Sequence, residues 1–146
     1  MSASRRISGI TVNGVASDGE RSQVCDHAAV ARWLLARVPS APEAAGHRIV
    51  HGDLRHAAPV RLDANVIEAL EGLVPLAPAH HSQALACIRA VAETWPHLQQ
   101  VACFDTAFHR TQDRLAQLYP LPRAFIDEGL VRFGFHGLSY AHVARA

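Results

Sequence analysis

Hydrophobic and polar residues recur along this chain at spacings that predict strands alternating with helices. Residues 7–12 alternate loosely between apolar and polar side chains, which favours a strand. The dipeptide Asn13-Gly14 that follows is a strong signal for a tight turn, and a second strand is possible over residues 22–25.

The next part of the chain changes to helical periodicity. Asp26 is suited to cap a helix that runs to about residue 38, since apolar residues such as Val30 and Trp33 recur on one face. Pro39 then marks the end of this helix and the start of a loop. A short buried strand is predicted over residues 48–51.

Further elements follow in the same alternation. Asp63 is a candidate N-cap for a second helix, and Pro75 and Pro78 predict an extended segment after it, because proline interrupts helices. The remaining predicted elements are a helix over 82–95, a strand over 100–104, a strand over 131–133, and a helix that begins after His136 and is cut off at residue 146.

This order predicts an α/β fold with helices packed on a mixed sheet. The length of 146 residues fits one domain, and 49% apolar with 18% charged residues fits a globular protein. A net charge of +1 gives no sign of a nucleic-acid or membrane partner. No secretory signal or membrane-spanning run is recognised, so we expect a cytoplasmic protein whose three cysteines are reduced and buried.

Three residues near predicted strand ends are candidates for chemistry. Arg48 lies beside Ile49 and Val50, so its guanidinium either binds an anion or pairs with a surface acid at a strand edge. Asp105 follows a buried strand, where its charge needs compensation, or where it caps the next turn. His136 could act on a ligand or could be a satisfied core or capping residue. Ten histidines invite a metal site, but none has zinc-site spacing.

Four segments together resemble the acetate kinase family, which phosphorylates a short-chain carboxylate with ATP. The resemblance runs from about residue 26 to residue 146, and the four segments are His47-Arg48-Ile49-Val50-His51-Gly52, Pro75-Leu76-Ala77-Pro78-Ala79-His80, Phe104-Asp105-Thr106-Ala107-Phe108-His109 and Arg132-Phe133-Gly134-Phe135-His136-Gly137. The fold it implies is a partial N-terminal lobe of the actin, Hsp70 and sugar-kinase class. We expect residues 1–146 to be a single incomplete domain of this kind.

The resemblance also implies roles for individual residues. Arg48 would contact the substrate carboxylate and the phosphoryl group, Asp105 would position the acceptor or help to hold Mg²⁺, and His136 would donate to the phosphoryl group in flight. The acetate pocket is implied to contain Val50, Ala79, His80 and Phe135 as well as Arg48. Ala79 stands where the family usually has leucine, so propionate or a longer acid could fit.

Several positions depart from the family pattern. The family's His-Gly-Gly is His51-Gly52-Asp53 here, and an aspartate adopts positive φ only at some cost. Asn-Pro after the active-site histidine is replaced by His81-Ser82, and Tyr140 replaces the last histidine of the Phe-His-Gly-Thr-Ser-His signature. The first phosphate loop and the whole nucleotide lobe have no counterpart in this sequence.

Two hypotheses follow. In the first, the chain is an acetate kinase-like phosphotransferase that uses ATP and Mg²⁺ on acetate or another short-chain carboxylate, although the isolated chain has no complete nucleotide site and is expected to be inactive. In the second, it is a non-catalytic remnant, a pseudoenzyme or half of a split enzyme that binds anions or a complementary chain. A homodimer is possible under either.

Overall fold

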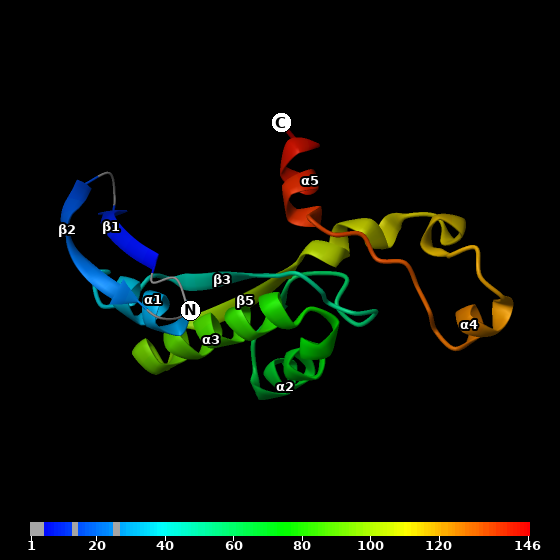
Figure 1. Ribbon diagram of the computed structural model, residues 1–146, viewed down its shortest axis with the longest axis horizontal. Helices are drawn as coiled ribbons and strands as arrows, with labels where there is room; N and C mark the ends of the chain where they lie inside the picture. The colour runs from blue at the N-terminus through cyan, green and yellow to red at the C-terminus, as the bar shows by residue number, and fades with distance from the viewer. Residues whose placement is uncertain (1–4, 13–14, 25–26) are drawn as a thin grey trace.

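The computed structural model describes residues 5–12, 15–24 and 27–146. Figure 1 shows an elongated arrangement, with an N-terminal hairpin at one end, a sheet and two helices in the middle, and a projecting arm at the other end. The predicted turn at Asn13-Gly14, the predicted cap Asp26 and Cys25 lie outside the described residues.

The hairpin consists of β1 (Arg5–Val12) and β2 (Val15–Val24), which pair antiparallel. The predicted first strand is confirmed, while the second strand begins earlier than the pattern over 22–25 indicated. Backbone pairing therefore extends the strand over residues such as Asp18 and Ser22, whose polarity hid it.

The central sheet consists of β3 (Ala44–Ile49), β4 (Val60–Arg61) and β5 (Gln99–Phe104). Its order in the described residues is β3-β5-β4, with β3 parallel and β4 antiparallel to β5. The predicted mixed sheet is thus confirmed. The strand predicted over 48–51 begins and ends earlier, because β3 pairs with β5 from Ala44 onward and its last pair joins Ile49 to Phe104.

Helices flank this sheet. The α-helices and the shorter 3₁₀ helices are α1 (His27–Leu35), α2 (Ala64–Gly72), η1 (Val74–Leu76), α3 (Pro78–Thr94), η2 (Asp105–Thr111), η3 (Arg114–Gln117), α4 (Arg123–Asp127) and α5 (Gly137–Val143). The cap predicted for the second helix is confirmed, since Asp63 Oδ1 accepts a hydrogen bond from the Val66 amide at 2.9 Å.

The buried core lies where α2 and α3 pack against β3 and β5. Its members are buried apolar side chains from these elements, namely Ile49, Leu70, Leu85, Ile88, Ala102 and Phe104. Within the described part of the chain, no helix has the combined length and hydrophobicity that crossing a lipid bilayer requires.

Three sequence predictions are corrected by the structure. Pro75 lies inside η1 and Pro78 opens α3, because the first helical turn needs no proline N–H and suits its fixed φ. The helix predicted to reach residue 38 ends at Leu35, and the next turns have the tighter 3₁₀ pattern. Residues 131–133 form no strand; the Arg132 amide donates to Gln117 within the arm.

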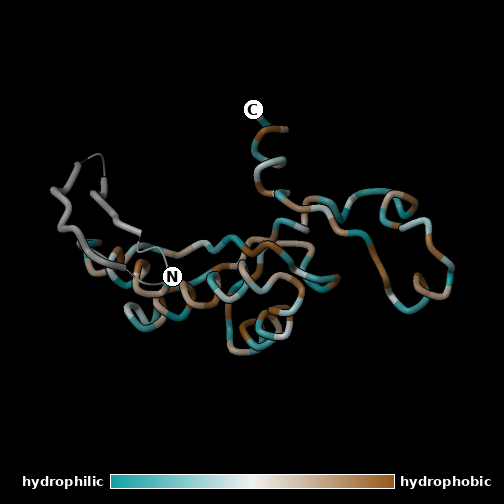
Figure 2. Tube along the Cα trace, viewed as in Figure 1, coloured by the Kyte–Doolittle hydropathy of each residue, from teal (hydrophilic) through white to brown (hydrophobic). Residues whose placement is uncertain are grey.

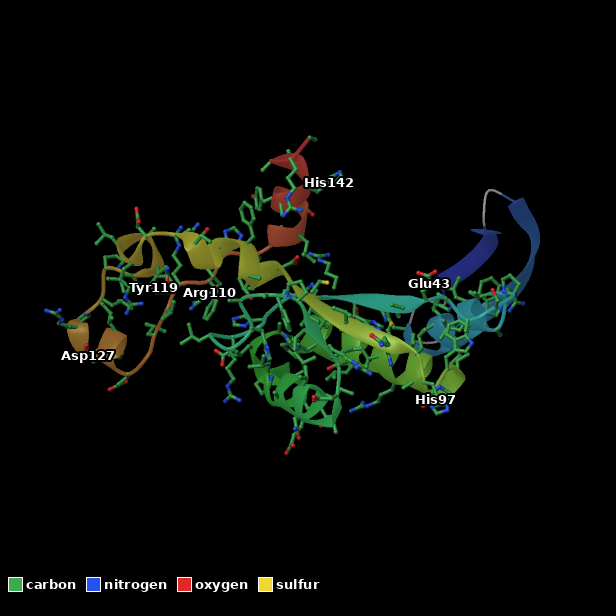
Figure 3. The ribbon with its side chains drawn as sticks, turned by 180° about the vertical axis from the view of Figure 1, so that it is seen from behind. Glu43, His97, Arg110, Tyr119, Asp127 and His142 are labelled. Atoms are coloured by element: carbon green, nitrogen blue, oxygen red, sulfur yellow. The ribbon has the colours of Figure 1, made fainter. Side chains whose placement is uncertain are left out.

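The arm, residues 112–135, leaves the body after η2 and returns to α5 (Figure 1). Figure 2 shows hydrophobic stretches along it, and several of its large apolar side chains are exposed, with Leu115 at 82%. In Figure 3, the labelled Tyr119 and Asp127 lie on this arm, whereas Glu43 and His97 lie at the opposite end of the sheet. Exposed apolar surface of this kind is typical of an interface.

Candidate functional site

The parallel pairing of β3 with β5 brings Arg48 close to Asp105. Arg48 stands beside Cys103 in the register, and Ile49 beside Phe104. Because side chains alternate along a strand, Ile49 and Phe104 both face the core, and their neighbours on the chain face the other side. Asp105 follows β5 directly and is therefore within reach of the arginine.

Arg48 and Asp105 form a strong ion pair. Arg48 Nη2 donates to Asp105 Oδ2 at 2.7 Å, and Nε donates to Oδ2 at 3.0 Å and to Oδ1 at 3.3 Å. The Asp105 side chain is 1% exposed, whereas the Arg48 side chain is 53% exposed. The hydrogen bonds and charge of Asp105 raise the pKa of Arg48 above its ordinary value. The pair thus holds a permanent cation at the surface.

His136 completes this group from the start of α5. Its Nδ1 lies 3.2 Å from Arg48 Nη2. A guanidinium only donates hydrogen bonds, so Nδ1 accepts and the ring proton of the neutral imidazole resides on Nε2. His136 has φ 56°, in the left-handed region that side chains rarely adopt. This backbone turn, together with the ring contact, leaves an Nε2–H donor beside the arginine.

The position of α5 depends on close backbone contact. A methyl group at Gly137 would overlap the carbonyl oxygen of Asp105, so only glycine lets α5 begin directly against η2. On the other side, the Gly52 amide donates to Thr106 Oγ1 at 3.0 Å, which ties the end of β3 to η2. Both contacts fix the segments that carry the three candidate residues.

A shallow pocket of about 320 Å³ lies between β3 and α3, next to this group. It is lined by residues from these two elements and the loop after β3, namely Gly46, His47, Arg48, Val50, His80, Gln83, Ala84 and Cys87. Three of the predicted pocket residues, Arg48, Val50 and His80, therefore share it. Ala79 is exposed at the start of α3 and does not line this pocket, and neither does Phe135.

Phe135 instead lies near His51, with ring centroids 5.8 Å apart, and Phe133 lies closer, at 4.4 Å. The structure gives positive φ to Asp53, at 55°, as the glycine of the family pattern implied. Its amide donates to His51 Nδ1 at 3.0 Å, and its carboxylate lies 4.0 Å from Arg55. The loop after β3 is thus held by contacts within itself and by the aromatic rings of Phe133 and Phe135.

Burial lowers the pKa of three histidines near this loop. Burial lowers the pKa of His81, and the proximity of His51 lowers it further. Burial also lowers the pKa of His51, partly offset by the charge of Asp53. Burial also lowers the pKa of His47, partly offset by the hydrogen bond that its Nε2 donates to Gln100 Oε1 at 2.7 Å. The neutral form of these three histidine rings is therefore favoured.

Asp105 does not fit direct coordination of Mg²⁺. Both of its oxygens accept from Arg48, it is nearly inaccessible, and a neighbouring guanidinium repels a cation. Among the residues that the structure describes, no group of three histidine, cysteine or acidic side chains could hold a metal ion. Of the two roles that the resemblance implied for Asp105, the geometry favours positioning.

Comparison with known proteins places the chain in a family. A sequence model of the Acetokinase family matches residues 33–146, which include Arg48, Asp105 and His136. The chain belongs to the acetokinase family. The acetate kinase of Methylocella silvestris is 49% identical over 124 residues, covering 82% of this chain and 31% of that protein. The acetate kinase of an Arthrobacter species is 41% identical over 138 residues, covering 90% and 36%.

Solved structures of acetokinase-family enzymes show the same fold. The acetate kinase of Entamoeba histolytica superposes with a TM-score of 0.78 at 29% identity, covering 90% of this chain and 34% of that one. A propionate kinase of Francisella tularensis superposes with a TM-score of 0.65 at 34% identity, covering 70% and 27%. The chain spans about a third of the length of the curated relatives it matches.

One residue close to the candidate group, His109, has no role assigned from the sequence. His109 follows Asp105 by four positions, and its ring contacts the segment that leads into His136. Its place in the segment Phe104-Asp105-Thr106-Ala107-Phe108-His109, which carries part of the family resemblance, is the signal that could have pointed to it. Cys87 and Cys103 are free thiols and only partly buried, and burial raises the pKa of Cys87.

Proposed function

We propose that the group formed by Arg48, Asp105 and His136 is the acceptor side of a phosphotransferase that converts a short-chain carboxylate, such as acetate, to an acyl phosphate with ATP. The observation that carries the proposal is the convergence of two polar side chains from separate segments, Asp105 and His136, on the guanidinium of Arg48. Membership of the acetokinase family supports the reaction class.

Arg48 would bind the carboxylate. Within the described residues, Nε and Nη2 are engaged by Asp105 and His136, which leaves the N–H groups of Nη1 for a ligand. A charge-assisted hydrogen bond from Nη1 to a carboxylate oxygen is strong, and the burial of Asp105 prevents the arginine from swinging away. Asp105 is then a positioning residue, with no direct contact to the substrate.

His136 would stabilise the transferring phosphoryl group. In such a transfer, negative charge spreads over the equatorial phosphoryl oxygens, and preorganised donors lower the barrier. The Nε2–H of His136 and the Arg48 guanidinium supply two donors of this kind. ATP with its bound Mg²⁺ would supply the phosphoryl group, and no Mg²⁺ ligand is assigned to these residues.

The size of the acid is set by the apolar neighbours of Arg48. Val50 lines the pocket beside the arginine, and the family resemblance assigns Phe135 and Ala79 to the same acyl pocket. A methylene changes selectivity by roughly 1–3 kcal/mol. Ala79→Leu is therefore expected to disfavour propionate relative to acetate, and competition between the two acids would measure the change.

The test uses the Methylocella silvestris acetate kinase with its matched third replaced by this chain. Acyl phosphate is trapped as the hydroxamate, and Arg48→Ala is expected to lower kcat/KM for acetate about 100-fold, as for loss of one transition-state donor. Arg89→Ala, on the outer surface of α3, is the matched control. Equal activity of the two variants would refute the proposal.

A second candidate is anion binding without turnover, in a chain that associates with another polypeptide. The exposed apolar side chains of the arm favour such association. The purified chain alone is expected to give no acetate-dependent ADP release. Acetate-dependent release that Arg48→Ala abolishes would contradict that expectation, and light scattering would show whether a second copy or a complementary chain binds.

A further inference from the structure

His109 occupies a position that the roles above leave unexplained. Its Nε2 lies 2.9 Å from the carbonyl oxygen of Phe135, the residue that precedes His136. The ring also lies directly on the backbone of Gly134, where a methyl group would overlap it. His109, in η2, therefore contacts two consecutive residues, Gly134 and Phe135, of the segment that leads into α5.

The orientation of this ring is defined by its neighbours. A carbonyl oxygen only accepts, so Nε2 of His109 carries the proton and donates it. Gln112 Nε2 lies 3.5 Å from Nδ1, on the opposite side of the ring. Phe108 and Tyr140 meet the ring edge-on, with centroids 5.2 Å and 5.8 Å away. Tyr140, where the family signature has histidine, thus helps to confine His109.

The hydrogen bond from His109 to Phe135 constrains the backbone of His136. The Phe135 carbonyl and the His136 amide belong to one rigid peptide plane, so holding the carbonyl fixes the plane from which the φ of His136 is set. That φ is 56°, a conformation that a histidine holds only when its surroundings enforce it. The same φ directs Nδ1 toward Arg48.

We propose that His109 is a positioning residue that locks His136 in the left-handed conformation, with its Nδ1 on Arg48 and its Nε2–H free to donate. This inference rests on the proposed function, because it matters for chemistry only if His136 faces a phosphoryl group. It adds His109, which lies outside the pocket, to Arg48, Asp105 and His136. The hydrogen bond that His109 donates would set the tautomer of His136.

The experiment follows the ring nitrogens of His136 by ¹⁵N NMR in the full 146-residue chain at about pH 8, above the ordinary pKa of a histidine side chain in a peptide. Three variants are compared. His109→Leu removes the donor, His109→Gln keeps an N–H near the position of Nε2, and His97→Leu alters an exposed histidine at the far end of the sheet (Figure 3). A His136→Asn variant assigns the signals.

Unmodified chain, His109→Gln and His97→Leu are expected to show one tautomer of His136, with Nδ1 unprotonated. His109→Leu is expected to show both tautomers exchanging, while the amide spectrum of the core stays unchanged. If His109→Leu does not fold, His109→Asn replaces it, because its shorter amide cannot reach the Phe135 carbonyl. A single, unshifted His136 tautomer in the variant that lacks the donor would overturn the inference.

Acetate is added in a separate titration and followed at the Arg48 Nε–H signal. A lack of response in the unmodified chain would count against the proposed function alone, because the tautomer measurement needs no ligand. Normal acetate binding together with an unchanged His136 tautomer in His109→Leu would count against the positioning role alone. The two ideas can therefore fail independently.

Discussion

Removal of either partner of the Arg48–Asp105 ion pair is expected to destabilise the fold, but unequally, because the partners differ in exposure. Arg48→Ala leaves a carboxylate that is 1% exposed without its cation. Breaking a buried pair in this way costs roughly 3–5 kcal/mol. Because water can enter the half-exposed space that the arginine vacates, the expected loss of stability is about 3 kcal/mol.

Asp105→Asn removes the buried charge instead. The remaining guanidinium is 53% exposed and stays hydrated, so only the charge-assisted hydrogen bonds are lost, at about 1–2 kcal/mol. The double variant Arg48→Ala/Asp105→Asn contains no buried charge. It is therefore expected to be more stable than Arg48→Ala alone.

Urea denaturation at pH 7, followed by circular dichroism, measures these free energies of unfolding for the unmodified chain, the two single variants and the double variant. Arg89→Ala is the control, because it breaks an exposed pair with Glu71 and should cost less than about 1 kcal/mol. A double variant no more stable than Arg48→Ala at pH 7 would refute the reasoning.

Three further outcomes are expected in the same denaturation assay. Gly137→Ala should lose roughly 1–3 kcal/mol through overlap with η2, whereas Gly72→Ala, with open space around it, should gain up to about 1 kcal/mol; equal effects would contradict the close contact. Asp53→Gly should gain about 0.5–1 kcal/mol by relieving positive φ, and a loss would argue against strain. Because the folded state lowers the pKa of His81, the unfolded chain takes up protons first and stability falls below about pH 6.5. His81→Asn should flatten this fall, and an unchanged slope would exclude His81 as its source.

Much of the central fold follows from local pattern. Residues 100–104 form a strand because buried positions alternate there, and Asp63 caps a helix because its carboxylate has no better partner than the first-turn amides. The pairing of Arg48 with Asp105 follows from the register of two parallel strands, because Arg48 lies near the end of β3 and Asp105 directly follows β5. These features depend on near neighbours or on a single register.

Other features depend on contacts that no local pattern encodes. Residues 131–133 have the apolar character of a strand, but a strand needs a partner. The arm offers them the Gln117 carbonyl oxygen, which accepts one hydrogen bond from the Arg132 amide. Pro78 was expected to prevent a helix, although its position in the first turn makes it a helix start. The role of His109 depends on the backbone of Gly134, which is distant in sequence.

The left-handed backbone at His136 also narrows the ways in which this site can be redesigned. Asparagine, aspartate and glycine tolerate such a backbone, whereas branched or bulky side chains do not. A library that varies residue 136 freely would mostly sample chains with a displaced α5, so loss of turnover would report misfolding as often as missing chemistry. Asparagine is the substitution that changes the donor while sparing the turn.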